Sequence, residues 1–597
     1  MDQDKKKYII FVICLSILAV FVIRLAYLQL FTSDELTKES DKNSIKTITV
    51  TPPRGIMYDR NGNILVDNKP SYTVTITPNQ FDKNILEEIS SVLELSADTL
   101  AMNLKNIKGT NRFNPAKVKR DVDFKVISYI AENRERLNGV DYQVEAIRYY
   151  PNNFRGSHSF GYCNEISPKQ LEKQIGDYYK QGDMIGANGL ESTYENHLRG
   201  VKGYKFITVD VKGREIGSLN EGNSDIAPVN GADLVLGMDK DLQELAEKLI
   251  YGKQGAIIAV DPRNGEILCF VSKPDFDLSS FSGKTDPKIF SELLNDPQKP
   301  LFNRVIQTKY PPGSTWKMMM SLAALEAGII TTTSTISCPG SFVYGNRSFA
   351  DHGAYGSINV VRALEVSANV FYYKLGLQVG IDNYYKYSKM FGFGTKTGID
   401  IPNETVGLLP SREYLDKRYG ENKWTQGLLV SLGIGQGELG VSPVQMVAYT
   451  AAIAMNGLYC QPHFVSKIKN SMNNEEEIVK YEQRRIDLPL KYYEAVKKGM
   501  YLVVNGNGTA SKIRSKDVVL CGKTGTAQNT SGKNHSWFVG FAPYEDPRIA
   551  ICVLGEFEGW GSSFGAPTAA ALMLKYLGAS YNEADPEIKS VGDNHYD

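Results

Sequence analysis

The chain has 597 residues, more than one hydrophobic core usually organises, so two or more domains are expected. Its 67 basic and 67 acidic residues balance, so it lacks the charge footprint of a nucleic-acid-binding protein. A hydrophobic content of 42% with 53 glycines is ordinary for a globular protein of mixed helices and strands. Composition therefore leaves the function to local motifs.

An apolar segment at residues 8–31 follows a cluster of three lysines, Lys5 to Lys7. As a helix it is about 36 Å long, enough to cross a bilayer. The alternative is a cleaved signal peptide, but that apolar region is shorter and ends in small residues, whereas this one ends in Leu28-Gln29-Leu30-Phe31. Residues 1–34 are thus predicted to form a cytoplasmic tail and an uncleaved anchor, with the rest of the chain outside.

Residues 35–235 are predicted to form a first, elongated domain. Asp59-Arg60-Asn61-Gly62 is typical of a hairpin turn between two strands. The stretch from about 80 to 185 begins with apolar residues at helical spacing and predicts an accessory lobe. A polar, linker-like stretch between 220 and 235 then marks a domain boundary.

Residues 236–583 are predicted to form a second domain of the α+β class. A strand, a turn and a strand at 255–268 precede several helices, which extend to about residue 510. Three strands are expected at 518–520, 536–541 and 549–554, followed by a closing helix at 569–577. This order favours a mostly antiparallel sheet with a helical insert. The acidic tail, 584–597, is expected to be disordered.

The stretch Tyr310-Pro311-Pro312-Gly313-Ser314-Thr315-Trp316-Lys317 places a serine hydroxyl and a lysine amine three residues apart at the start of an apolar run. Residues i and i+3 of a helix lie on the same face, so Ser314 and Lys317 can meet. A buried lysine beside a serine is typical of an activated nucleophile. A bare S-x-x-K is also compatible with a serine that caps a helix and a lysine that reaches solvent.

Two further clusters lie in the second domain. Ser367-Ala368-Asn369 is expected at a helix start, and Lys523-Thr524-Gly525-Thr526 on a strand. The ordered set S-x-x-K, S-x-N and K-T-G is shared by penicillin-binding proteins and class A β-lactamases. Each motif is weak alone, but the three in this order, each on a fitting element, make coincidence improbable.

With these motifs the chain resembles a class B penicillin-binding protein over nearly its whole length. The second domain resembles the family's transpeptidase domain, and the first its non-catalytic pedestal, through Arg54-Gly55-Ile56 and Gly189-Leu190-Glu191. Within the class it most resembles the elongation-type penicillin-binding protein 2, through Gly398-Ile399-Asp400-Ile401-Pro402, Leu409-Pro410-Ser411-Arg412-Glu413 and Gly433-Ile434-Gly435-Gln436-Gly437.

The chemistry of these residue types suggests a role for each. An amine accepts a proton only when it is neutral, so Lys317 is predicted to be the base for Ser314, with its pKa lowered by burial and by Lys523. Ser367 is expected to relay a proton, and Asn369 to orient Lys317 and the substrate amide. Lys523 and the hydroxyls of Thr524 and Thr526 are expected to bind the substrate carboxylate, and Gly525 to leave room for a substrate strand. The resemblance places the oxyanion hole at the backbone N–H groups of Ser314 and Thr526.

The resemblance implies an inner-membrane, single-pass D,D-transpeptidase that cross-links peptidoglycan stem peptides at D-Ala-D-Ala during elongation and is acylated by β-lactams. No cofactor is expected. No glycosyltransferase domain fits before residue 235, so glycan polymerisation is expected from a partner, which the resemblance implies is a SEDS-family membrane polymerase. The alternatives are a division-type or low-affinity resistance protein, a β-lactamase or D,D-carboxypeptidase, and a β-lactam sensor. Acceptor amine, antibiotic affinities and assembly state stay open.

Three other patterns were weighed. Gly561-Ser562-Ser563-Phe564-Gly565 matches a G-x-S-x-G nucleophile elbow, but the histidine it would need downstream is His595, in the tail, so a loop is predicted. Cys338, Asp351 and His352 lack recognisable zinc-ligand spacing and are expected to make polar loop contacts. Tyr344-Gly345-Asn346 is predicted to be a turn. The seven cysteines form no C-x-x-C, and their pairing is left open.

Overall fold

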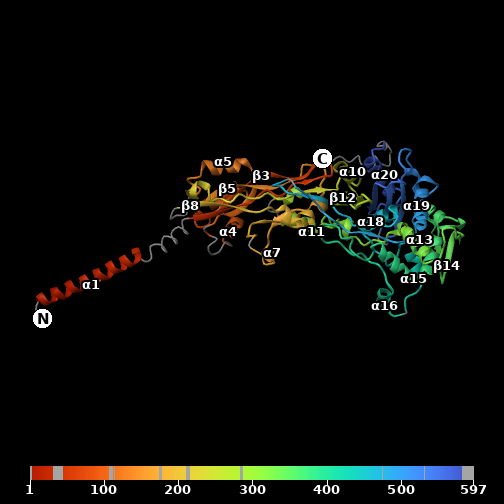
Figure 1. The fold of residues 1–597 in the computed structure, drawn as a ribbon, viewed down its shortest axis with the longest axis horizontal. Coiled ribbons are helices and arrows are strands. Elements are labelled where there is room, and N and C mark those ends of the chain that lie inside the picture. The colour runs from red at the N-terminus through yellow and green to blue at the C-terminus, as the bar shows by residue number, and fades with distance from the viewer. Residues whose placement is uncertain are drawn as a thin grey trace.

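The computed structural model describes residues 3–30, 45–105, 112, 114–173, 176, 178–209, 215–282, 287–421, 423–473, 475–529 and 532–580. The molecule is elongated (Figure 1), with one long helix at its N-terminal end and a helix-rich region at the other. The predicted disordered tail, 584–597, lies outside the described residues.

Helix α1 (Gln3–Leu30) contains an apolar stretch, Lys7–Tyr27, that is long and apolar enough to cross a membrane. None of this stretch is buried against the rest of the protein. A bare apolar helix of this length is stable where hydrocarbon covers it. The helix predicted at residues 8–31 is therefore confirmed, and its exposure fits a membrane anchor.

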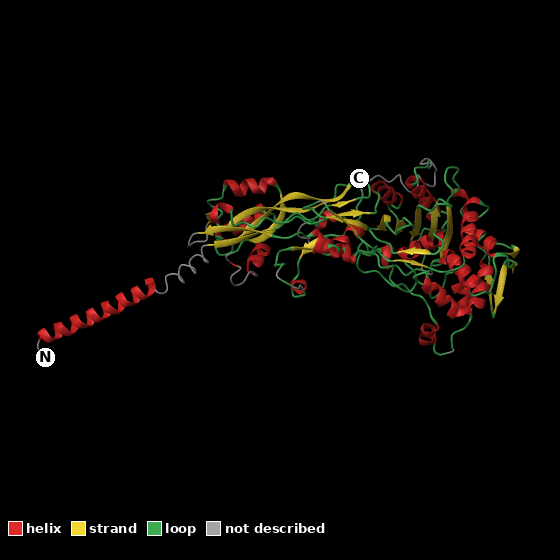
Figure 2. Ribbon diagram, viewed as in Figure 1, coloured by secondary structure: helices red, strands yellow, loops and turns green. Residues whose placement is uncertain are grey.

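The first domain is rich in strands (Figure 2). Its long strand β3 pairs with β2 through a hairpin turn, where Asp59 accepts hydrogen bonds from the backbone N–H groups of Asn61 and Asn63 and Gly62 has φ +85°. The predicted hairpin is confirmed. The elements of this region are β1 (Ile45–Val50), β2 (Met57–Tyr58), β3 (Ile64–Ile76), α3 (Leu86–Val92), α4 (Ala97–Lys105), β4 (Ala116–Val122), α5 (Phe124–Glu132), β5 (Val140–Tyr149), α6 (Ser157–Phe160), β6 (Cys163–Glu165), α7 (Pro168–Leu171), β7 (Met184–Gly186), α8 (Gly189–Thr193), α9 (Glu195–Leu198), β8 (Gly203–Val209) and β9 (Glu215–Ser218).

A buried ion network holds this domain together. The Arg54 guanidinium contacts Glu191 and Glu195, both at 2.6 Å. On the other side of Glu191, the Nε atom of Arg148 lies 2.6 Å from the carboxylate. Glu191 is fully buried, and these two arginines hold its pKa below the usual value against the opposing effect of burial. The motif residues Arg54 and Glu191 thus owe their pairing to charge compensation inside the domain.

The second domain is built on one five-stranded antiparallel sheet in the order β12-β11-β23-β22-β21. Helices cover both faces: α10 and α20 pack on one, and α18 on the other. The elements are β10 (Asp233–Leu236), α10 (Lys240–Leu249), β11 (Gly255–Val260), β12 (Ile267–Lys273), α11 (Pro287–Asn295), α12 (Arg304–Gln307), α13 (Lys317–Glu326), β13 (Ile336–Cys338), β14 (Ser341–Tyr344), β15 (Arg347–Ala350), β16 (Gly356–Ile358), α14 (Val360–Glu365), α15 (Asn369–Met390), α16 (Arg412–Tyr419), α17 (Gly427–Gly433), α18 (Pro443–Ala454), β17 (Leu458–Cys460), β18 (Val465–Lys469), β19 (Glu476–Ile478), β20 (Gln483–Arg485), α19 (Leu490–Asn505), β21 (Cys521–Ala527), β22 (His535–Ala542), β23 (Ile549–Gly555) and α20 (Gly565–Tyr576).

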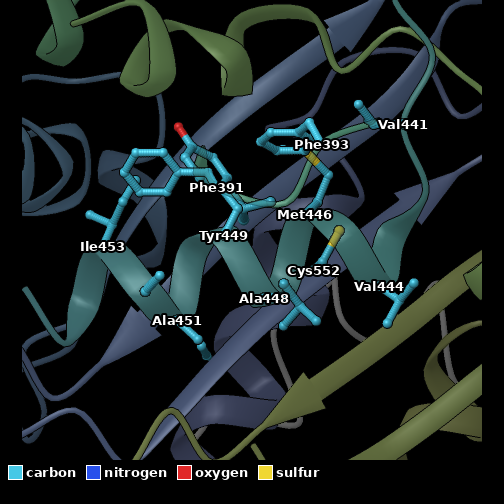
Figure 3. Packing of buried hydrophobic residues seen from close by; sticks show 14 of the residues in the cluster. Phe391, Phe393, Val441, Val444, Met446, Ala448, Tyr449, Ala451, Ile453 and Cys552 are labelled. Atoms are coloured by element: carbon cyan, nitrogen blue, oxygen red, sulfur yellow. The ribbon is translucent and has the colours of Figure 1, made fainter. Parts of the chain in front are cut away.

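The predicted α+β class is confirmed, with one shift. The strand expected at 518–520 begins at Cys521, where pairing with Phe541 of β22 starts. Helix α18 is buried along its whole length, and Figure 3 shows Tyr449 between the aromatic rings of Phe391 and Phe393, with Cys552 of β23 across the helix. The ring centroids of Tyr449 and these two phenylalanines are 5.6 and 5.3 Å apart. This packing holds α18 against one face of the five-stranded sheet.

A second sheet crosses the predicted boundary near residue 235. Strand β10 pairs in parallel with β2 of the first domain and antiparallel with β18 of the second. Beside this sheet, the Tyr194 hydroxyl donates to Asp400, whose carboxylate also accepts the backbone N–H of Phe464. The two domains therefore share backbone hydrogen bonds as well as side-chain contacts.

We predict that Glu191→Gln lowers the free energy of unfolding by about 3–5 kcal/mol, because it leaves buried arginine charge without its carboxylate. Denaturant titration of the full chain in detergent, followed by circular dichroism, measures the change. Glu476→Gln is the matched control. The Glu476 side chain pairs with Lys467 but is 44% exposed, so removing its charge should leave the unfolding curve unchanged. Equal curves for the two variants would contradict a structural role for the network.

Candidate active site

Ser314 lies on a tight turn in front of a buried helix. It belongs to a 3-10 turn, Gly313–Trp316, and Lys317 opens α13. Gly313 has φ +58°, and a β carbon there would lie 2.6 Å from the Thr526 carbonyl oxygen of β21. The glycine thus lets the serine turn pack directly against this strand. Ser314 stays partly exposed, while α13 is buried up to Leu325.

The Lys317 amine reaches from α13 to the S-x-N segment. It donates to the Ser367 carbonyl oxygen and to Asn369 Oδ1, both at 2.7 Å, and lies 3.3 Å from Ser367 Oγ. The predicted contact with the Ser314 hydroxyl is not among these hydrogen bonds of the described chain. The two oxygens at 2.7 Å can only accept hydrogen bonds, so each takes one N–H of the Lys317 amine. A neutral amine has only two N–H groups, so its nitrogen lone pair is left to accept a proton.

Ser367 joins the two lysines of the site. Its hydroxyl accepts from Lys523 Nζ at 2.8 Å and lies on the other side within reach of Lys317. The residue has φ +56°, a conformation that costs energy for a side chain other than glycine and concentrates at functional sites. The structure therefore brings the S-x-N and K-T-G motifs and Lys317 into one hydrogen-bonded chain.

Burial sets the protonation of both lysines. It lowers the pKa of Lys317 well below its ordinary value, Lys523 lowers that pKa further by charge repulsion, and the Asp351 carboxylate opposes both. Burial also lowers the pKa of Lys523 to about 7. The oxygens around the two amines carry no formal charge. The neutral form of Lys317, which a base requires, is thus favoured.

The K-T-G segment lies on β21, which among the described strands pairs only with β22 and forms an edge of the sheet. The Thr524 hydroxyl is 2.6 Å from that of Thr509 and its residue is buried, whereas Thr526 is partly exposed. A β carbon at Gly525 would lie 2.7 Å from the Pro312 carbonyl oxygen. A side chain at position 525 would therefore clash with the loop that precedes Ser314. The sequence suggested a different reason for Gly525, namely room for a substrate strand.

Gln436 is a site neighbour to which sequence reasoning gave no role. Its side-chain amide donates to the Thr526 carbonyl oxygen at 3.0 Å, and the Gly313 N–H donates to the neighbouring Gly435 carbonyl at 2.9 Å. The glycine-rich motif at 433–437 thus holds the serine turn and the K-T-G strand together. The glycine-rich motif itself is visible in the sequence, but the residues that Gly435 and Gln436 contact lie more than 80 positions away along the chain.

The remaining sequence patterns fall on loops. Tyr344 and Arg347 face each other at the turn of the β14–β15 hairpin, and the stretch from Gly561 to Gly565 links β23 to α20, as predicted. Asp351 binds backbone N–H groups, and the exposed His352 ring lies edge-on to Trp560. Within the described ranges, no three His, Cys, Asp or Glu side chains are arranged to hold a metal ion. His595 is outside those ranges.

Comparison with known proteins gives a consistent result. The family description "Penicillin binding protein transpeptidase domain" matches residues 255–574, and "Penicillin-binding Protein dimerisation domain" matches residues 49–236. The chain belongs to the penicillin-binding protein family. The chain is 33% identical to the peptidoglycan D,D-transpeptidase MrdA of Acinetobacter baumannii over 94% of its own length and 87% of that protein. It is 32% identical to MrdA of Escherichia coli over 98% and 96%.

Solved structures of penicillin-binding proteins share the fold. A complex between the penicillin-binding protein PBP2 and MreC from Helicobacter pylori superposes with a TM-score of 0.78, at 32% identity, and covers 89% of this chain and 99% of that one. A chain from a peptidoglycan synthase complex superposes with a TM-score of 0.70, at 25% identity, and covers 97% and 100%. The resemblance seen in the motifs is confirmed.

We predict that Lys523→Met moves the acid limb of penicillin acylation to higher pH. Removing this positive neighbour raises the pKa of Lys317, so the amine becomes neutral only at higher pH. The measurement is the second-order rate of covalent labelling against pH. Lys497→Met is the control: Lys497 is another buried lysine with a lowered pKa, but its amine binds Ala454 and Asn456. An unmoved limb in Lys523→Met would contradict the coupling.

Proposed function

We propose that this protein is a peptidoglycan D,D-transpeptidase that works through an acyl-enzyme on Ser314. The hydrogen-bonded chain from Lys523 through Ser367 to Lys317, beside the partly exposed Ser314, carries the proposal. Lys317 takes the Ser314 proton as the serine oxygen attacks the carbonyl carbon of the penultimate D-Ala. The bond to the terminal D-Ala breaks, and its nitrogen leaves with a proton delivered through Ser367.

The second half of the reaction reverses these roles. The amine of a neighbouring stem peptide attacks the Ser314 ester, gives up a proton toward Lys317 and Ser367, and leaves the serine hydroxyl restored. Protonated Lys523, with Thr526 and Thr524, binds the terminal carboxylate of the donor peptide, whose charge raises the pKa of Lys523 when bound. The backbone N–H groups of Ser314 and Thr526 stabilise the oxyanion, and Asn369 orients the amide.

Covalent labelling with fluorescent penicillin tests the nucleophile. The protein in detergent should carry one stable label, and Ser314→Ala should lose it, because no hydroxyl remains to form the ester. Ser321→Ala is the matched control, since this buried serine lies seven residues after Ser314, in α13, and its hydroxyl binds the Lys317 carbonyl and the Tyr372 hydroxyl. Stable labelling of Ser314→Ala would contradict the assignment, and rapid turnover of nitrocefin by the native protein would favour a β-lactamase.

The cellular role we propose is cross-linking during lateral wall elongation. The similarity to MrdA proteins over nearly the full chain supports it. The anchor α1 would hold the protein in the cytoplasmic membrane with Lys5 to Lys7 inside and both domains outside. Glycan strands would come from a SEDS-family polymerase that binds the anchor and the first domain. The similarity to a chain of a peptidoglycan synthase complex supports such a partner.

Depletion of the protein in its own cells tests this role. Loss of lateral cross-linking should give round cells, whereas loss of a division enzyme gives filaments. Depleted cells are then complemented with one of two variants. The Ser321→Ala protein, the matched control, should restore the cell shape, whereas the Ser314→Ala protein should not. Filaments on depletion would move the assignment to the division-type enzymes.

A further inference from the structure

Helix α15 begins at the active site without a cap from its own sequence. Its N-cap residue is Ala368, which has no side-chain acceptor for the first backbone N–H groups. Asp351, 18 residues before Asn369, supplies two of the missing bonds. Its Oδ1 accepts the Asn369 N–H and its Oδ2 accepts the Val370 N–H, each at 2.8 Å.

Asp351 is itself fixed on the base of the β14–β15 hairpin. Its backbone N–H donates to the Gly340 carbonyl at 2.9 Å, and Oδ1 also accepts the His352 N–H at 2.8 Å. The Tyr373 hydroxyl of α15 donates to the Ala350 carbonyl at 3.3 Å. The carboxylate therefore has a defined position against the helix end, and the positive end of the helix dipole favours its charge.

The capped residues are those that hold the base. Asn369, whose N–H Asp351 binds, accepts from Lys317 through its side chain, and the strained Ser367 accepts through its carbonyl. We propose that Asp351 is a positioning residue: its carboxylate fixes the start of α15 so that Asn369 and Ser367 meet the Lys317 amine. The inference rests on the proposed function, because it gives Lys317 the role of base.

Asp351 also acts on Lys317 by its charge. Lys523 of β21 faces the amine as a positive group, and Asp351 is the carboxylate that raises the Lys317 pKa. From α15 the Tyr372 ring lies 5.5 Å from Nζ, and burial raises the pKa of that phenol, so it stays neutral. Partial removal from water and the charges of Lys317 and Lys523 lower the pKa of His352, which favours its neutral form. In α14, Glu365 pairs with Arg362 at 2.7 Å.

The test is the pH dependence of penicillin acylation in Asp351→Asn, measured on the full chain in detergent. The amide keeps the shape but turns a donor toward a backbone N–H and carries no charge. We expect the plateau rate to fall roughly ten- to a hundredfold, because the base and its partners lose their alignment. The acid limb should move to lower pH, because Lys317 loses the negative charge that favours its protonated form.

Two further variants separate charge from shape. Asp351→Glu keeps the charge with a longer reach, so its acid limb should stay near the native position although its plateau falls. Asp382→Asn is the matched control, because it removes an exposed carboxylate of the same helix that pairs with Arg412, and its profile should equal the native one. Thermal unfolding of each variant identifies any that fail to fold, and Asp351→Glu then carries the test alone through its lowered plateau.

The outcomes are distinct. A native protein that forms no label would overturn the proposed function itself. A native protein that labels normally, together with Asp351 variants whose plateau and acid limb match those of Asp382→Asn, would overturn the positioning role and leave the proposed function intact. A lowered plateau with the limb moved down in Asp351→Asn supports it.

Discussion

The site depends on the burial of two lysine amines next to each other among uncharged oxygens. Taking an ammonium out of water is expensive, and placing a second one near it adds repulsion, so the fold favours the neutral amine. The pKa of both Lys317 and Lys523 is lowered as a result. A folded protein that only needed stability would place apolar residues here. The same unfavourable burial gives Ser314 a base and leaves Lys523 poised to gain a proton when an anionic substrate arrives.

The rest of the domain keeps this arrangement rigid. The apolar α13 carries Lys317 into the core, and the five-stranded sheet presents Lys523 on its edge strand β21. Gly313 allows the serine turn to touch that strand, and Gly435 and Gln436 bind the turn and the strand respectively. Asp351 completes the set by capping α15 from the adjacent hairpin. A network of this kind tolerates little displacement, because its hydrogen bonds link segments that are distant in the chain.

The sequence predicted the features that are local. The i, i+3 spacing of Ser314 and Lys317, the strand nature of the K-T-G motif, the hairpin turn at Gly62 and the apolar anchor all follow from a few neighbouring residues. The features it missed depend on contacts between distant segments. One is the hydrogen bond from the Lys317 amine to the backbone carbonyl of Ser367, 50 residues on. Likewise, the start of β21 at Cys521 depends on its pairing with Phe541 of β22, 20 residues on.

The domain boundary shows the same limit. Linker-like composition between 220 and 235 predicts a domain boundary there, but it gives no sign that β10 joins β2 and β18 in one sheet across it. Short strands such as β2 and β19 carry no periodicity long enough to reveal their partners. The residue types Cys338, Asp351 and His352 raise the possibility of a metal site, whereas the capping role of Asp351 comes from its position in the fold. Nonlocal capping of this kind has no sequence spacing that could announce it.

The central claim is that Lys317 is neutral in the resting protein. The most direct measurement is a carbon NMR titration of protein labelled with 13C at the lysine Cε atoms, with Lys317→Met and Lys523→Met used to assign two resonances. We predict that both resonances titrate far below those of the exposed lysines, the one from Lys523 near pH 7. Titration of the Lys317 resonance together with the surface lysines, near their ordinary pKa, would contradict the account.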